Sequence, residues 1–155
     1  MSFTGDLITK HEGIRTKVYL DTAGHPTIGV GFNLDGAGAQ ATCVALGLDY
    51  AGLRAGTAQL STDQVNAIFA HQLAAVYIQA AALFPNYSTM PQNAQAVIAD
   101  LIFNLGITTF QKFHQTIAAL KVGAWTAAAN CLTNSAWFHQ VGSRAVEDVA
   151  LLRSI

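Results

Sequence analysis

Three side chains near the amino terminus, Glu12, Asp21 and Thr27, have the types and spacing that hydrolysis of a glycosidic bond requires. The reaction needs one carboxylic acid to protonate the leaving oxygen and one carboxylate to activate or replace a water molecule. Glu12 lies at the end of a predicted helix, where the negative end of the helix dipole favours the protonated form that a general acid needs. By spacing alone, a surface glutamate followed by ordinary turn residues has the same pattern, so both interpretations stay open.

The elements that must position these side chains are a short helix and a small sheet. Residues 4–11 are predicted to be helical, because Thr4 can cap the helix and Gly13 can stop it. From Lys17 onward, β-forming residues recur at even spacing and are interrupted by a turn-like run at 21–24, which predicts two or three strands. A helix end beside such a hairpin can bring an acid, a carboxylate and a hydroxyl into one cleft.

The rest of the chain is predicted to be helical. Ser61 and Gln64 form a capping box, and the helix behind it is expected to reach about Leu83. A helix of that length suits a connector between two lobes, because an α-helix rises about 1.5 Å per residue. The other helices are expected within 36–56 (one or two) and over 91–105, 109–120, 125–132 and 143–153. The predicted fold class is therefore α+β, with a small antiparallel sheet near the amino terminus and a mainly helical C-terminal lobe.

The composition predicts one compact, soluble domain. Of the 155 residues, 52% are hydrophobic and only 11% are charged, against roughly 25% charged in an ordinary soluble domain. The formal net charge of −1 provides no basic patch, which disfavours nucleic acid as a partner. Polar side chains at Asn66, His71, Gln72 and Gln79 interrupt the apolar run 65–84, which favours a buried amphipathic helix over membrane insertion. The amino terminus has no basic run followed by an apolar stretch, so no secretory signal is expected.

Other kinds of site find little support in the sequence. Cys43 and Cys131 lie far apart and form no CxxC pair, so we expect free, buried thiols, although a single disulfide stays open. The five histidines have no ligand spacing, so no metal is expected. The run 36–41 fits a G-x-G-x-x-A dinucleotide fingerprint, but no βαβ unit surrounds it. We therefore expect no cofactor.

Three motifs near the amino terminus resemble the phage-type lysozymes, the glycoside hydrolase family of the T-even phage enzyme. They are His11-Glu12-Gly13, Tyr19-Leu20-Asp21-Thr22 and Thr27-Ile28-Gly29-Val30-Gly31. The family motif is Glu, eight residues, Asp, five residues and Thr, and the spacing here is the same. Further motifs match the family's C-terminal lobe in order and spacing: Phe103-Asn104-Leu105-Gly106, Trp125, Ala136-Trp137-Phe138 and Arg144-Ala145. The resemblance covers nearly the whole chain.

The resemblance implies a lysozyme-like fold of two lobes. The N-terminal lobe covers about 13–60, the connecting helix about 61–84, and the C-terminal lobe, on which the first helix packs, about 85–155. By the same resemblance, Glu12 is the general acid for the β-1,4 bond between N-acetylmuramic acid and N-acetylglucosamine. Asp21 and Thr27 then position and activate a water on the opposite ring face. The family is held to invert the anomeric centre, which needs roughly 6.5–9.5 Å between the two carboxyl groups.

Residues of the C-terminal lobe match further positions of the family. Arg144 matches an arginine that pairs with the catalytic glutamate, and we expect it to orient Glu12. Phe103, Asn104 and Thr116 match positions that line the saccharide cleft, with Thr116 standing where the family often has serine. That Phe103 is simply a core residue stays an open alternative.

Two features depart from the family. Phe32 stands where many relatives have histidine, so any salt bridge at that site is gone. The chain also lacks the strong positive charge of T-even relatives, so its recruitment to the anionic wall should be weaker and less sensitive to salt.

The expected role is that of a phage endolysin that acts as a monomer on bacterial peptidoglycan. It would be made in the host cytoplasm and admitted to the periplasm or cell wall by a separate pore. One alternative is a lysozyme carried on a phage tail or a secretion device. Another is a catalytically silent wall-binding module, which the intact Glu12, Asp21 and Thr27 disfavour. A lytic transglycosylase would use one acid and no water, so Asp21 and Thr27 also favour hydrolysis.

Overall fold

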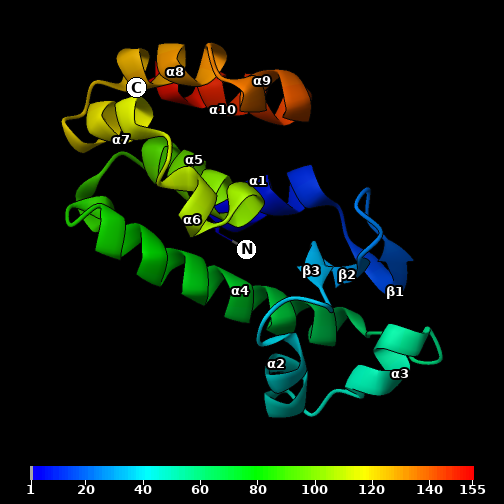
Figure 1. Ribbon diagram of the computed structural model, residues 1–155. Helices are drawn as coiled ribbons and strands as arrows, with labels where there is room; N and C mark the ends of the chain where they lie inside the picture. Colours follow the sequence, from blue (N-terminus) through cyan, green and yellow to red (C-terminus); the bar gives the residue numbers. More distant parts are fainter. Residues whose placement is uncertain (1) are drawn as a thin grey trace. The chain divides into compact units, whose positions relative to one another are not determined.

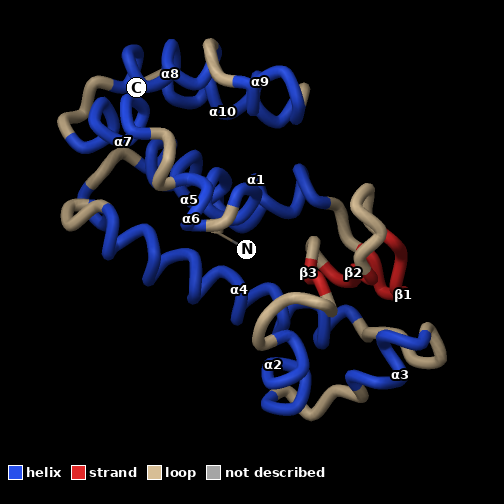
Figure 2. Tube along the Cα trace, in the orientation of Figure 1, coloured by secondary structure: helices blue, strands red, loops and turns tan. Residues whose placement is uncertain are grey.

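The computed structural model describes residues 2–155 and is mostly helical, with a small sheet near the amino terminus (Figures 1 and 2). This confirms the predicted α+β class. The elements in chain order are α1 (Phe3–Glu12), β1 (Arg15–Leu20), β2 (Pro26–Gly29), β3 (Phe32–Asn33), α2 (Ala39–Ala45), α3 (Tyr50–Ala55), α4 (Thr62–Leu83), the 3-10 helix η1 (Tyr87–Thr89), α5 (Gln92–Leu105), α6 (Ile107–Phe110), α7 (His114–Lys121), α8 (Trp125–Thr133), α9 (Ala136–Val141) and α10 (Ser143–Arg153).

The described chain divides into two compact units. We call Thr9–Ala75 the sheet unit, and residues 2–8 together with Val76–Ile155 the helical unit. Helices α1 and α4 each contribute residues to both units. The sheet unit holds Glu12, Asp21 and Thr27, whereas the helical unit holds Phe103, Asn104, Thr116 and Arg144.

Helix α1 places Glu12 at its carboxyl end, as the sequence predicts, but its cap differs from the prediction. The backbone N–H of Gly5 donates to the Ser2 hydroxyl at 3.2 Å, so Ser2 caps the helix instead of Thr4. The helix therefore begins one residue earlier than expected, and Thr4 is buried within it. Gly13 follows Glu12 with a φ of +74°, a conformation that suits the end of a helix.

The sheet has three antiparallel strands in the order β1-β2-β3. Thr27 on the central strand lies opposite Tyr19 on β1 and Asn33 on β3. Ile28 on the same strand is fully buried, so the next side chain along β2 is anchored in the core. The central strand is thus held from both sides at the residue that carries the candidate hydroxyl.

Helix α4 confirms the predicted capping box. The Ser61 N–H donates to Gln64 Oε1 at 2.8 Å, and the Gln64 N–H donates to the Ser61 hydroxyl at 3.2 Å. The helix is long and apolar enough to cross a membrane by length and composition alone. The expectation of a buried amphipathic helix is correct for one face only, since the opposite face carries exposed alanines and Ile78. The buried face consists of Val65, Ile68, Phe69, Val76 and Ala80.

The helical unit differs from the sequence prediction at several helix ends. The helix expected over 109–120 is broken into α6 and α7. Helix α9 was not predicted, and the Ser135 hydroxyl caps it by accepting from the Phe138 N–H at 3.2 Å. Pro91 is the residue before α5 instead of its first residue. The stripe predicted on α5 is confirmed, since Val97, Ile98, Leu101 and Ile102 are all buried.

Candidate active site

The carboxylate of Glu12 lies against the turn between β2 and β3. A Cβ atom built on Gly31 would lie 2.9 Å from Glu12 Oε2, which is closer than such atoms normally approach. Gly31 also has a φ of +60°, a backbone conformation that residues other than glycine rarely adopt. The turn therefore leaves room for the half-buried Glu12 only because residue 31 lacks a side chain.

Asp21 occupies the turn between β1 and β2, where backbone N–H groups fix one of its oxygens. Oδ1 accepts from the N–H of His25 at 2.8 Å and from that of Ala23 at 2.9 Å. These bonds, the one from His25 most strongly, hold the pKa of Asp21 below its usual range. Asp21 is therefore a carboxylate at neutral pH. Within residues 2–155 its described side-chain bonds fall on Oδ1, which leaves Oδ2 to accept from a solvent molecule.

Thr27 is buried on β2, and its hydroxyl proton already has a partner. Oγ1 donates to the His25 carbonyl at 3.0 Å. A hydroxyl has only one proton to donate but two lone pairs that can accept. Toward a water molecule, Thr27 can therefore act only as an acceptor while this bond is kept.

Tyr19 links the two carboxylates electrostatically, a role that the sequence analysis did not assign. Burial raises the pKa of the Tyr19 phenol, and the negative charges of Glu12 and Asp21 raise it further. The Arg15 guanidinium, 5.8 Å from the centroid of the ring, acts in the opposite direction. The Tyr19 phenol is therefore sensitive to the charges of both Glu12 and Asp21 in the sheet unit. The pairing of Tyr19 with Thr27 across the sheet could have indicated this residue.

In the helical unit, Arg144 forms a buried ion pair that sequence reasoning missed. Its Nε donates to Asp100 Oδ2 at 2.8 Å, and its Nη2 donates to Asp100 Oδ1 at 3.0 Å. The only sequence signal for Asp100 is that it is an acidic residue within the apolar stripe of α5. Two-point pairing of this kind fixes the plane of a guanidinium. The predicted pairing of Arg144 with Glu12 stays a prediction.

A second buried carboxyl group, Asp148, lies beside this ion pair. Both of its oxygens are shielded from solvent, next to the Asp100 carboxylate. Burial and the adjacent Asp100 carboxylate raise the pKa of Asp148 well above its usual range. Asp148 is therefore held as the neutral acid, and the one positive charge of Arg144 is matched by Asp100.

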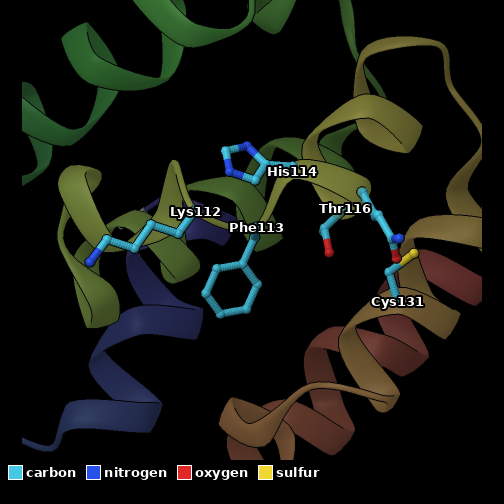
Figure 3. A pocket seen from close by; sticks show the side chains of 6 residues that line it. Lys112, Phe113, His114, Thr116 and Cys131 are labelled. Atoms are coloured by element: carbon cyan, nitrogen blue, oxygen red, sulfur yellow. The ribbon is translucent and has the colours of Figure 1, made fainter.

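The predicted saccharide residues differ in their surroundings. Phe103 and Asn104 are half-buried at the end of α5, and Asn104 Oδ1 accepts from Trp137 Nε1 at 2.9 Å. Thr116 is buried on α7 and lines a pocket of about 470 Å³ in the helical unit (Figure 3). The other lining residues are Lys112, Phe113, His114, Gln115 and Cys131. The pocket has the size of a small-ligand site, but contact of these three residues with a saccharide stays a prediction.

Both cysteines are free, as the sequence analysis expects. Cys43 is fully buried, and burial raises the pKa of its thiol. Cys131 is only half-buried, because it lies at the wall of the pocket on α8 (Figure 3).

The chain is similar to several known proteins. The family model for phage lysozyme matches residues 9–153. The chain is 24% identical over 147 residues to the pre-baseplate central spike protein Gp5 of Enterobacteria phage T4, an alignment that covers 90% of this chain but 26% of that protein. It is 21% identical to probable T4-type lysozymes 1 and 2 of Dictyostelium discoideum, covering 96% and 90% of this chain and 92% and 87% of the relatives. Since the family model covers the sheet unit and nearly all of the helical unit, the chain belongs to the phage lysozyme family and so to the glycoside hydrolases.

Proposed function

We propose that this chain is a muramidase that hydrolyses the β-1,4 bond between N-acetylmuramic acid and N-acetylglucosamine in bacterial peptidoglycan. The observation that carries the proposal is the arrangement in the sheet unit. Glu12 is seated against Gly31, while the backbone of His25 bonds to the side chains of both Asp21 and Thr27. Membership in the phage lysozyme family supports the same substrate class.

In the proposed reaction, Glu12 donates its proton to the glycosidic oxygen as the bond to the anomeric carbon breaks. The lowered pKa of Asp21 makes it a weak base before the reaction, so its first task is to orient the water. A water molecule has two protons, and Asp21 Oδ2 and Thr27 Oγ1 are two acceptors for them. With both protons held, the oxygen lone pair can attack the anomeric carbon. One proton of the water then passes to Asp21, and attack on the face opposite Glu12 inverts the anomeric centre.

The helical unit would supply substrate contacts and orientation. We assign Arg144 to the orientation of Glu12, with Asp100 fixing the plane of its guanidinium. Phe103, Asn104 and Thr116 would contact the saccharide. Because the Asn104 carbonyl oxygen is occupied by Trp137, the side-chain amide N–H₂ is the group left to bind sugar.

The variant Glu12→Gln tests the acid. We expect it to abolish clearing of outer-membrane-permeabilised Gram-negative cells while the circular dichroism spectrum and thermal midpoint stay those of the wild type. Asp63→Asn is the matched control, since it removes an exposed carboxylate at the start of α4 and should retain full activity. Clearing by Glu12→Gln near the wild-type rate would refute the assignment.

Mass analysis of the released muropeptides tests the reaction. Reducing muramic acid ends are expected from a muramidase. Ends carrying 1,6-anhydro muramic acid would instead indicate a transglycosylase, and intact glycan with cleaved peptides would exclude both. If the wild-type protein releases any products of glycan cleavage, the chain is not a catalytically silent wall-binding module.

The biological role that we propose is a monomeric phage endolysin, present in the host cytoplasm until a separate pore admits it to the wall. A second candidate, a lysozyme carried on a phage tail, is favoured by the similarity to the T4 spike protein, of whose length this chain spans about a quarter. Mass spectrometry of purified phage particles separates the two. An endolysin should be absent from the particles and present in the lysate, whereas a tail lysozyme should be present in the particles in a fixed ratio to tail proteins.

A further inference from the structure

The backbone of His25 is the point where the two water-binding side chains meet. Its N–H donates to Asp21 Oδ1 at 2.8 Å. Its carbonyl accepts from the Asp21 N–H and from the Thr27 hydroxyl, each at 3.0 Å. A displacement of residue 25 would therefore move Asp21 and Thr27 together.

The side chain of His25 leads away from this point to two further charged residues. His25 Nδ1 lies 3.7 Å from Asp35 Oδ2, which makes an ion pair when the imidazole is protonated. Asp35 Oδ1 lies 2.5 Å from Arg54 Nη2. Asp35 follows β3 and Arg54 lies on α3, so the three side chains join the hairpin turn to two other segments of the sheet unit.

Arg54 is itself fixed on α3. Its Nη1 donates to the Tyr50 hydroxyl at 3.3 Å, and that hydroxyl donates to the Leu34 carbonyl at 2.8 Å. Leu34 is fully buried, so this end of the series of contacts is attached to the core. The turn residues 22–25 at the other end are exposed.

We propose that Asp35 and Arg54 are positioning residues for the hydrolysis, because they hold His25 and through its backbone fix Asp21 and Thr27. This inference rests on the proposed function. Neither residue reaches the reacting atoms, so both act only through the geometry of the turn. When the imidazole is protonated, the Asp35 carboxylate, which Arg54 fixes, holds it in place, and the three backbone contacts of His25 transmit that position to the two acceptors.

The exposure of these side chains makes the proposal separable from a role in stability. The side chains of Arg54 and Asp35 are 48% and 31% exposed. Ion pairs this accessible to solvent contribute little to the free energy of folding. By contrast, a misplacement of about 1 Å at the reacting groups can lower the rate by up to about a hundredfold. Loss of the pair should therefore reduce turnover without melting the protein.

The test uses the full chain and soluble peptidoglycan fragments, with kcat and KM measured separately. We expect Arg54→Met and Asp35→Asn each to lower kcat about tenfold, with KM and the thermal midpoint unchanged. Arg54→Lys should restore most of kcat, because it keeps the charge beside Asp35. Arg153→Met is the matched control: it removes an exposed arginine that donates to Asn130 in the helical unit, and it should leave kcat unchanged.

Hydrogen exchange of the His25 amide reports directly on how firmly the turn is held. Exchange should become faster in Arg54→Met, because the bond from this amide to Asp21 is then held less firmly. A wild-type kcat in Arg54→Met, a fall in kcat matched by a fall in thermal midpoint, or no rescue by lysine would each overturn the inference. The variant Glu12→Gln distinguishes failure of this inference from failure of the proposed function. If Glu12→Gln is inactive but Arg54→Met is not impaired, only the positioning role of Asp35 and Arg54 is refuted.

Discussion

Replacing Asp148 with asparagine should change how the free energy of unfolding depends on pH. Asp148 is fully buried and lies beside the Asp100 carboxylate, so its pKa in the folded protein is raised well above the usual value. In the unfolded chain an aspartate titrates near pKa 3.9. Between these two pKa values the folded state holds a proton that the unfolded state has released. Stability must therefore fall as pH rises across this interval, by about 1.4 kcal/mol for each pH unit.

Asparagine keeps the shape of the neutral acid and does not titrate. The variant Asp148→Asn should lack this contribution, so its stability relative to the wild type should rise by about 1.4 kcal/mol per pH unit above about pH 4 and level off once the pH passes the raised pKa of Asp148 in the folded protein. Urea unfolding of both proteins at pH 5, 6, 7 and 8, followed by circular dichroism, measures the difference directly. Asp63→Asn, at an exposed position, should show no such trend. Parallel stability curves for the wild type and Asp148→Asn would show that Asp148 is ionised in the folded protein and would refute the reasoning.

Two further predictions concern the sheet unit and its connecting helix. Gly31→Ala should lower clearing activity more than tenfold, because the new methyl group meets the Glu12 carboxylate. It should also lower the free energy of unfolding by about 1–2 kcal/mol, because alanine disfavours the left-handed backbone conformation. Unchanged kinetics with soluble fragments would contradict the placement of Glu12. Ser61→Ala should lower the free energy of unfolding by about 1 kcal/mol through loss of the α4 cap, with activity retained. Urea unfolding measures this change. An unchanged unfolding midpoint would show that the cap contributes little to stability.

The sequence predicted best those elements whose signals are local. The capping box before α4 needs only residues within four positions of each other, and both of its bonds form. The end of α1 at Glu12 could be predicted equally well, because Gly13 can adopt the positive φ that ends a helix. Helix α9 was missed because it is short, and the Ser135 cap that starts it resembles an ordinary turn residue.

The candidate site was predictable in its residue types but not in its bonds. The spacing of Glu12, Asp21 and Thr27 could be read directly, since one helix end and one hairpin carry them. That the backbone of His25 bonds to Asp21 and Thr27 depends on turn geometry, to which residue types give little guide. The pairing of Arg144 with Asp100 joins residues 44 positions apart, and no periodicity in the sequence connects them.

The composition of the helical unit has a consequence for the order of events during translation. This unit needs residues 2–8 as well as Val76–Ile155, whereas the sheet unit is one continuous stretch of chain. Ribosomes add about 5–20 residues per second, so Leu7 and Ile8, buried in the finished protein, wait on the order of several seconds for the segments they pack against. The sheet unit can close in that interval. The entropic cost of joining segments grows only with the logarithm of their separation in the chain. The separation of residues 2–8 from Val76–Ile155 therefore delays completion of the helical unit but lowers the stability of the finished protein only slightly.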